Sequence, residues 1–224
     1  MTTVVIPVYD EVTQLDFTAP HQFLSMVPDI TVIVASVDGA PVASQGLFFA
    51  KLGDLEAIEA CDVLYVPGGL GCIRAMEDPR FISAISRLAK TAEYITSVCS
   101  GSLILGAAGL LKGRRAACHW AWRDMLSEFG AVPDASRVVR DGNVLTGGGV
   151  TAGVDFALTL ISELRGADVA QCVQLGLEYS PAPPFDAGRP DTAPAHIRAA
   201  VTAQMGALLG DGRERVKILA SRMA

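Results

Sequence analysis

The chain has 224 residues, of which 50% are hydrophobic and 19% are charged, and its formal net charge is −6. The large apolar fraction can fill the core of an α/β domain and excludes a disordered chain. The acidic balance gives no electrostatic reason to bind nucleic acid or an anionic membrane, so we expect neither as a partner.

The first predicted element is a buried strand at 3–8, an apolar run typical of parallel sheets. No basic region precedes it and no run approaches the ~18 apolar residues of a membrane span, so we expect neither a signal peptide nor a membrane helix. A loop leads to Asp16, and Thr18-Ala19-Pro20 predicts the start of a helix. Asp16 would then lie past the carboxyl end of the strand, where ligands bind in open α/β sheets, or would simply cap the helix.

A second strand is predicted at 30–37, followed by a short hairpin over 42–50 that Gly46 interrupts. A third buried strand at 62–66 ends in the glycine-rich turn 67–71. Glycines at such a place allow positive φ angles and a close approach of the backbone to a ligand. Their N–H groups could stabilise a developing negative charge, although the turn is not a phosphate-binding fingerprint.

An amphipathic helix is predicted over 79–93. The stretch that follows, 94–106, changes from a β-rich run ending at Val98 to small residues and helix formers from Ser100 onward. Cys99 lies at this junction, where a sharp strand-to-helix turn places one side chain on a nucleophile elbow. The helix N-terminus would favour the reactive thiolate, which makes Cys99 the candidate nucleophile; the alternative is a buried core cysteine.

The cysteines number five, and no two of them are spaced as Cys-x-x-Cys. They are Cys61, Cys72, Cys99, Cys118 and Cys172. An odd number without such spacing argues against a disulfide framework and against a zinc site. We therefore expect a reducing, cytoplasmic setting and no metal.

Further strands and helices alternate in the second half of the chain. The predicted elements are a helix at 100–111, a strand at 114–118, a helix at 119–130, a hairpin at 138–145, and helices at 150–164 and 167–177. Residues 179–194 hold five of the twelve prolines, which predicts an ordered surface loop. A helical segment at 195–224, interrupted at 210–212, completes what we expect to be a single domain over 1–224.

This alternation predicts a mostly parallel sheet with helices on both faces. In such a sheet Asp16, Gly68-Gly69, Cys99 and Gly147-Gly148-Gly149 converge on one edge, because each follows a strand. Four separate segments that point to one place argue more strongly for a site than any one of them.

A cysteine nucleophile needs an acid or a base nearby. His119 follows a strand and could approach the same edge, although a structural histidine is the commoner outcome. The residue after the thiol is Ser100 rather than histidine, which leaves Asp16 as the best candidate for proton transfer. Four aromatic residues could line an apolar pocket or pack in the core. They are Trp120, Trp122, Tyr179 and Phe185.

Several segments resemble the DJ-1/PfpI superfamily. They are 62–69, the elbow 97–102, and 107–116 followed by His119-Trp120. Three more segments are similar, more narrowly, to the isocyanide (isonitrile) hydratases of that superfamily: 14–21, 140–153 and 177–185.

The resemblance implies a flavodoxin-like fold, also described as class I glutamine amidotransferase-like, and a homodimer without metal or organic cofactor. It also implies hydration of an isocyanide, R–N≡C, to an N-substituted formamide. Cys99 would attack the terminal carbon to form a thioimidate, with Asp16 as general acid and base. Ser100 would contribute its backbone N–H and its hydroxyl near the site. The hydratases carry threonine at the position of Ser100, a difference of one methyl group that should alter packing more than chemistry.

The resemblance also extends to the surroundings of the thiol. Gly69 and Gly148 would shape them, and the backbone at Val150 would approach Cys99. His119 and Tyr179 would have supporting roles.

Other branches of the superfamily fit less well. Sensor domains of helix-turn-helix regulators share the elbow, but the segment after the Pro-rich loop is too short for a two-motif DNA-binding region. Proteases and deglycases favour histidine after the cysteine, or a glutamate on the first segment. A thiol sensor that oxidises Cys99 to the sulfinic acid, or a ligand-binding protein without turnover, stays open as an alternative.

Overall fold

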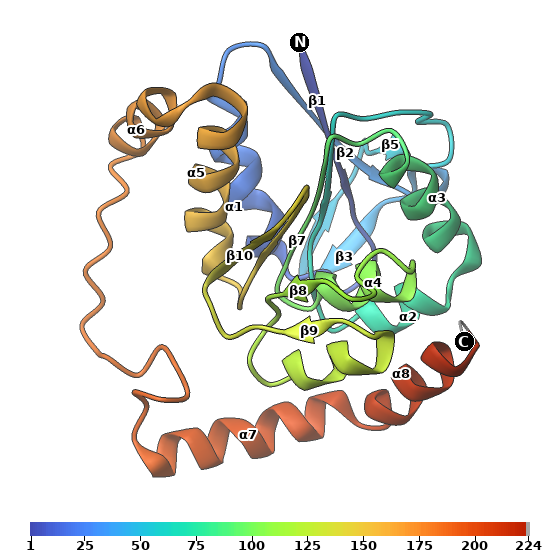
Figure 1. The fold of residues 1–224 in the computed structure, drawn as a ribbon, viewed down its shortest axis with the longest axis vertical. Helices are drawn as coiled ribbons and strands as arrows, with labels where there is room; N and C mark the ends of the chain where they lie inside the picture. The colour runs from blue at the N-terminus through green and yellow to red at the C-terminus, as the bar shows by residue number, and fades with distance from the viewer. Residues whose placement is uncertain (223–224) are drawn as a thin grey trace.

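A computed structural model describes residues 1–222 and shows an α/β fold built on a seven-stranded sheet (Figure 1). The strand order is β10-β11-β7-β6-β1-β2-β5, and every neighbouring pair is parallel except the hairpin β10–β11. The strands are β1 (Thr2–Pro7), β2 (Ile30–Ser36), β5 (Gly53–Asp54), β6 (Val63–Val66), β7 (Tyr94–Val98), β10 (Val138–Asp141) and β11 (Val144–Gly147). The mostly parallel sheet predicted from the sequence is confirmed.

Helices cover both faces of this sheet (Figure 1). One face carries α1 (Gln14–Ser25), α5 (Ala152–Arg165) and α6 (Ala167–Gly176), and the other carries α2 (Cys72–Glu77), α3 (Pro79–Ala89) and α4 (Gly101–Ala107). The central strands β1 and β6 are buried between these layers, which explains their apolar sequences. Their carboxyl ends lie at the same edge of the sheet, because the two strands are parallel neighbours.

The sequence of α3 contains both the residues that start the helix and those that form its buried face. The Asp78 carboxylate accepts the N–H groups of Arg80 and Phe81, and Pro79 occupies the first turn, where its missing N–H costs nothing. Phe81, Ala84, Ile85 and Leu88 form its buried face.

The start of α1 differs from the prediction. The helix begins at Gln14 rather than at Thr18, so Asp16 lies in its first turn and Pro20 lies inside it. Thr13 holds the extended conformation of a residue that precedes a helix, which fixes the earlier start. The interior proline leaves one carbonyl without its helical partner.

The predicted helix at 119–130 is also wrong. The chain closes turns of three residues there, from His119 to Trp122 and from Trp122 to Met125, and forms the 3₁₀ helix η2 (Arg123–Phe129). Gly130, with φ of 72°, ends it in the left-handed conformation.

Two small sheets complete the strand inventory of the described residues. The hairpin of β3 (Val42–Ser44) and β4 (Leu47–Phe49) confirms the prediction for 42–50, with Gln45 and Gly46 at positive φ in its turn. The predicted strand at 114–118 is shorter, as β8 (Arg115–Ala116), and pairs with β9 (Val132–Pro133).

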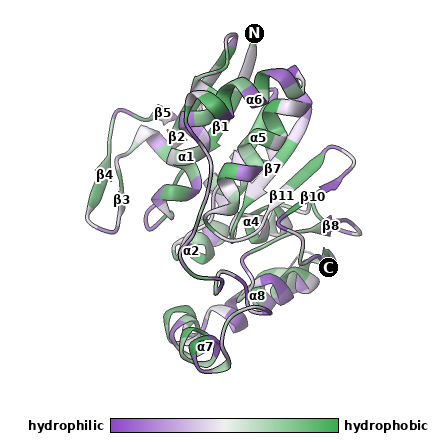
Figure 2. Ribbon diagram, turned by 90° about the vertical axis from the view of Figure 1, so that its left-hand side faces the viewer, coloured by the Kyte–Doolittle hydropathy of each residue, from purple (hydrophilic) through white to green (hydrophobic). Residues whose placement is uncertain are grey.

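The carboxyl-terminal part lies apart from the sheet (Figures 1 and 2). A long segment without helix or strand leads from α6 to α7 (Ala195–Leu209), which has no buried residue. The helix α8 (Gly212–Ser221) returns to the body, where Val216 is buried and Arg215 pairs with Glu77 of α2. The end of the predicted helical segment, 223–224, lies outside the described residues.

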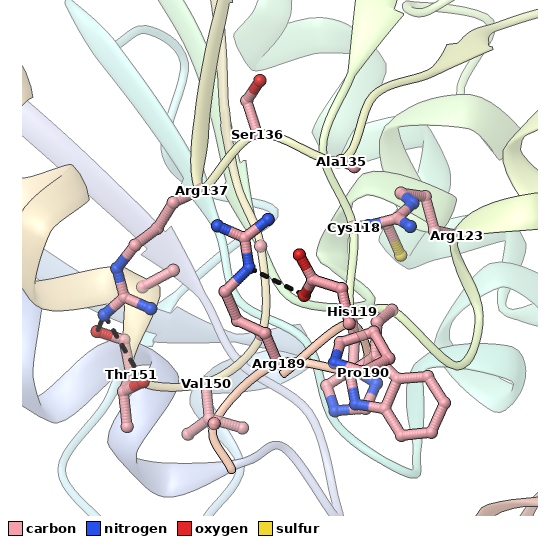
Figure 3. A pocket seen from close by; sticks show the side chains of 16 residues that line it. Cys118, His119, Arg123, Ala135, Ser136, Arg137, Val150, Thr151, Arg189 and Pro190 are labelled. Atoms are coloured by element: carbon pink, nitrogen blue, oxygen red, sulfur yellow. Dashed lines mark hydrogen bonds and ion pairs between the residues drawn. The ribbon is translucent and has the colours of Figure 1, made fainter. Parts of the chain in front are cut away.

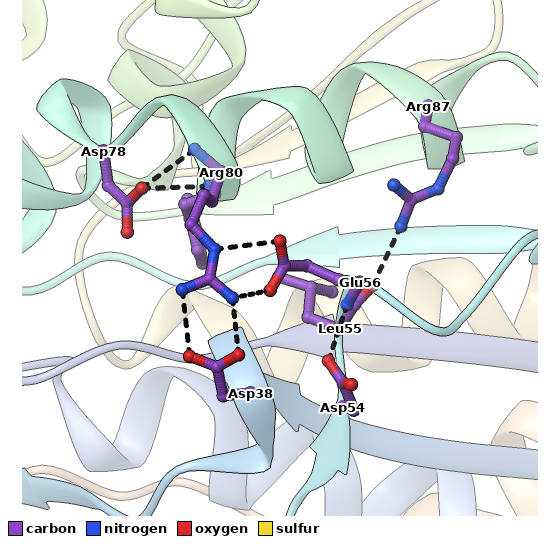
Figure 4. A network of polar contacts seen from close by, with 8 residues as sticks. Asp38, Asp54, Leu55, Glu56, Asp78, Arg80 and Arg87 are labelled. Carbon is purple, nitrogen blue, oxygen red and sulfur yellow. Dashed lines mark hydrogen bonds and ion pairs between the residues drawn. The ribbon is translucent and has the colours of Figure 1, made fainter.

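Two arginines of α3, Arg80 and Arg87, bind the neighbouring loops (Figure 4). The Arg80 guanidinium pairs with the carboxylates of Asp38 and Glu56, while Arg87 donates to the carbonyls of Leu55 and Ile58. These contacts hold the loop after β5 against the helix layer.

No helix within residues 1–222 is both long enough and apolar enough to span a membrane.

Candidate active site

The predicted elbow is present at Cys99, between β7 and α4. The residue has φ of 57°, a left-handed conformation that costs energy for any side chain other than glycine. Its N–H donates to the carbonyl of Gly148 at 2.7 Å and to that of Gly147 at 3.2 Å, so the end of β11 holds the strained residue in place. A glycine is required at position 101, two residues after Cys99, because a Cβ there would lie 2.2 Å from the carbonyl oxygen of Val66.

Asp16 is fully buried in the first turn of α1. One carboxyl oxygen, Oδ2, accepts the N–H of Gly68 at 2.9 Å, and Oδ1 has no hydrogen-bond partner within residues 1–222. Pro20 cannot donate to the Asp16 carbonyl four residues earlier, and the hydroxyl of Tyr65 donates to that carbonyl instead, at 2.8 Å. Pro20 frees the Asp16 carbonyl and Tyr65 of β6 binds it, so the two residues together fix the position of the Asp16 backbone.

The carboxyl and the thiol change each other's proton affinity. Burial raises the pKa of Asp16 to about 7, although the Gly68 N–H and the neighbouring Cys99 thiol lower it in part. Burial and the charge of Asp16 raise the pKa of Cys99 above its ordinary value, against the effect of the Ser100 N–H. The expected low-pKa thiolate is therefore wrong for the resting site, because burial outweighs the helix N-terminus. The two groups form a coupled pair in which the Asp16 carboxyl loses its proton at lower pH than the Cys99 thiol.

Ser100 ties the elbow to the glycine-rich turn. Its hydroxyl accepts the N–H of Gly69 at 2.9 Å and donates to the carbonyl of Gly69 at 3.2 Å. A threonine hydroxyl makes the same two bonds, so serine preserves this link. Because the Gly69 N–H is already engaged, Gly69 contributes to the site through Ser100 rather than by facing the thiol directly.

Gly68 lies between Asp16 and Ser100, the residue that follows Cys99. A Cβ at this position would lie 2.5 Å from the Ser100 nitrogen and 2.9 Å from Oδ2 of Asp16. The sequence marked the glycine turn, but it did not single out Gly68 as the residue that holds the carboxylate. Nothing in the sequence indicated Tyr65, because its contact depends on how β6 meets α1.

A cavity of about 440 Å³ lies beside the elbow (Figure 3). Gly148, Val150 and His119 line it, whereas Cys99 and Asp16 do not. The cavity adjoins the elbow at Gly148, whose carbonyl accepts the Cys99 N–H.

His119 is a neutral residue of this cavity. Burial lowers its pKa, and its Nδ1 accepts the N–H of Ala121 at 3.3 Å, so the ring proton is on Nε2. The ring packs close to Gly149, where an added Cβ would lie 3.0 Å from Cδ2.

The other aromatic residues are scattered. The Tyr179 hydroxyl donates to Asp155 at 2.7 Å, and its ring packs edge-on against Phe23 with 5.9 Å between centroids, which anchors the start of the Pro-rich loop. Trp120 lines the cavity and Trp122 is buried. Phe185 is 80% exposed and is not a pocket residue of this chain.

The described residues offer no metal centre. Within 1–222, no three His, Cys, Asp or Glu side chains come together in a group that could hold a metal ion. All five cysteines are free.

Comparisons with known proteins find relatives that match most of this chain. The chain is 53% identical to isonitrile hydratase of Pseudomonas putida over 190 residues, which cover 84% of this chain and 83% of that protein. A solved THiJ/PfpI family protein from Pseudomonas syringae superposes with a TM-score of 0.91 at 41% identity, covering 98% of this chain and 90% of that one. The chain is therefore a homologue of isonitrile hydratase.

A regulator is among the more distant relatives. The HTH-type transcriptional regulator CdhR of Pseudomonas aeruginosa is 32% identical over 142 residues, which cover 61% of this chain but only 41% of the regulator. The profile of the DJ-1/PfpI family matches residues 2–163, which include Asp16, the glycine turn, the elbow and the end of β11. The chain belongs to the DJ-1/PfpI family.

Proposed function

We propose that this protein is an isocyanide (isonitrile) hydratase, which adds water to R–N≡C and releases an N-substituted formamide. The observation that carries the proposal is the buried Asp16 carboxyl, whose pKa is raised to about 7, coupled to the thiol on the Cys99 elbow. A carboxyl with such a pKa is suited to give and take a proton at neutral pH. Similarity to isonitrile hydratase of Pseudomonas putida supports the choice of substrate.

The first step joins the thiol to the substrate. Asp16 takes the proton of the Cys99 thiol, the sulfur bonds to the terminal isocyanide carbon, and Asp16 returns the proton to that carbon. The product is a thioimidate, R–N=CH–S–Cys99. The N–H of Ser100 lowers the pKa of the thiol and so favours the sulfur anion at the moment of attack.

The second step releases the product. Asp16 takes a proton from water as the oxygen bonds to the thioimidate carbon and passes that proton to the nitrogen, which gives R–NH–CH(OH)–S–Cys99. The C–S bond then breaks, Asp16 transfers the hydroxyl proton to the sulfur, and R–NH–CHO leaves the free thiol. No redox change occurs, so the cycle needs no cofactor. Gly68 keeps Asp16 oriented through both steps by its N–H.

The proposal includes a homodimer in a reducing, cytoplasmic setting. The free cysteines support the setting. Several large apolar side chains on α6 and on the part of the chain that follows it are exposed and would be covered by a second copy. They are Leu175 at 82%, Phe185 at 80% and Leu208 at 50% exposed.

Incubation of the purified protein with a neutral alkyl isocyanide tests the function. Formamide should appear with the wild type and should be absent with Cys99→Ala, as followed by NMR of the formyl proton. Asp16→Asn should slow turnover by about a hundredfold or more, since general acid–base catalysis contributes that much. A wild-type protein that converts no member of an alkyl and aryl isocyanide panel would refute the proposal.

A further inference from the structure

Three arginine side chains surround the cavity beside the elbow (Figure 3). Arg123 is the first residue of η2, Arg137 precedes β10, and Arg189 comes from the Pro-rich loop. This concentration of positive charge lies in a protein whose formal net charge is −6. It is not needed for an uncharged isocyanide.

Two of the three guanidinium groups already have carboxylate partners. Arg137 pairs with Asp155 and donates to the Thr151 carbonyl at 2.9 Å. Arg189 pairs with Asp191 at 3.2 Å.

Arg123 is different. It is half-buried, and it has no hydrogen bond or ion pair to any other residue of 1–222. The adjacent carboxylate, Asp124, is engaged by Arg213. Burial keeps the nearby His119 neutral by lowering its pKa, so it adds no charge. The cavity therefore keeps one positive charge that the described chain does not neutralise, and a partly desolvated charge without a partner is costly.

The remaining wall includes the apolar side chains of Trp120, Val150 and Pro190. A cavity of about 440 Å³ is within the usual size of a site for a small molecule. A guanidinium presents its donors in a planar fork that matches a carboxylate.

We infer that the isocyanide hydrated by this protein carries a carboxylate on its substituent, which Arg123 binds while the isocyano carbon points toward Cys99. The cavity adjoins the elbow, because Gly148 lines the cavity and its carbonyl accepts the Cys99 N–H. The isocyano group is linear and slender, which suits a substrate whose carboxylate lies in the cavity and whose reacting carbon lies at the elbow. This inference rests on the proposed hydratase activity.

The test compares ω-isocyano carboxylates of increasing length with their own methyl esters. The wild type should prefer at least one carboxylate over its ester by about tenfold or more in kcat/KM, since a charge-assisted bidentate hydrogen bond is worth that much. The preference should arise through KM, because the contact is made in ground state and transition state alike. It should shrink as the salt concentration rises, because the cavity is open to solvent.

Two substitutions of Arg123 test whether this residue causes the preference for the carboxylate. Arg123→Met should bring the ratio of carboxylate to ester close to one, and Arg123→Lys should keep part of it. Arg140→Met is the matched control, because Arg140 pairs with Glu163 outside the cavity, and it should keep the wild-type ratio. Turnover of the ester in each variant shows that the variant is folded.

The outcomes separate the two claims. Ester turnover without a preference for any carboxylate would overturn the inference and leave the hydratase proposal standing. A preference that survives Arg123→Met would also overturn it. If neither carboxylates nor esters are converted, the proposed function fails and the inference falls with it.

Discussion

The relative positions of Asp16 and the Cys99 elbow depend on Gly68, a residue without a side chain. Its N–H holds the carboxylate, and the space on its other side is filled by Ser100. The thiol–carboxyl pair therefore depends on a residue that carries no chemical group of its own.

Gly68→Ala should impair turnover severely. The added methyl would lie 2.5 Å from the Ser100 nitrogen, so either the elbow or Asp16 must move. A misplacement of about 1 Å at a catalytic group can cost on the order of a hundredfold in rate, and we expect a loss of at least that size in kcat/KM. The control is Gly206→Ala in α7, where no atom lies within 4 Å of the added Cβ. Wild-type kinetics in Gly68→Ala would show that the pair does not need this geometry.

The aspartate also makes the stability of the protein depend on pH. The pKa of Asp16 is raised by burial from an ordinary value of 3.8 to about 7 in the folded state. Between these values the folded state holds a proton that the unfolded state releases. The contribution of this carboxyl to stability is thus present at low pH and is lost as the pH rises through about 7.

Asp16→Asn should therefore be more stable than the wild type at about pH 8, by on the order of a few kcal/mol, and this advantage should shrink toward about pH 4. The amide oxygen can still accept the Gly68 N–H. Urea unfolding over this range measures the difference, and Asp186→Asn, on the exposed loop, is the control. A constant difference at all pH values would contradict the raised pKa.

Among the elements, the contact between β6 and α1 positions Asp16. The Tyr65 hydroxyl donates to the Asp16 carbonyl that Pro20 leaves free, so a strand residue and a proline together set the angle of the first helical turn. Neither residue touches the reacting atoms in the proposed mechanism.

Tyr65→Phe should lower the free energy of unfolding by about 1–3 kcal/mol, because it leaves the buried Asp16 carbonyl without a donor. The matched control is Tyr94→Phe in β7, whose hydroxyl has no hydrogen bond to another described residue. Denaturant titration of both variants gives the comparison. Equal losses in the two would mean that the Tyr65 hydroxyl does not support α1.

The elements also show what sequence reasoning can reach. Buried parallel strands are recognisable as apolar runs, and the change of pattern at Cys99 marks the elbow, so the sheet and the elbow followed from local signals. The start of α1 was placed too late because a proline usually stands at the first turn, whereas here Pro20 lies inside the helix.

Other features depend on tertiary packing and could not be predicted. The raised pKa of Cys99 comes from burial by segments distant in the chain, which outweighs a helix dipole that the sequence does reveal. The arginines around the cavity come from three separate segments, and their convergence has no local signature. The elbow at Cys99 and the position of Asp16 at the edge of the sheet were thus predictable, whereas the electrostatics of this region were not.

For the whole molecule, the main question is what supports α7. This helix has 15 residues and none of them is buried, and isolated helices of about that length are marginal in water. Its neighbour α8 is anchored to the body by Val216 and by the pair of Arg215 with Glu77. The proposed homodimer would cover α7 and the exposed loop before it.

Hydrogen exchange should therefore depend on protein concentration in this part of the chain alone. Amides of 195–209 should be protected at high concentration, where dimers dominate, and should exchange much faster on dilution, whereas the buried helix α3 should keep its protection throughout. Sedimentation at the same concentrations reports the mass of the species present. Protection of 195–209 that is unchanged in a demonstrated monomer would mean that the chain stabilises α7 by itself. In that case the exposed apolar side chains of this region would not be evidence for a second copy.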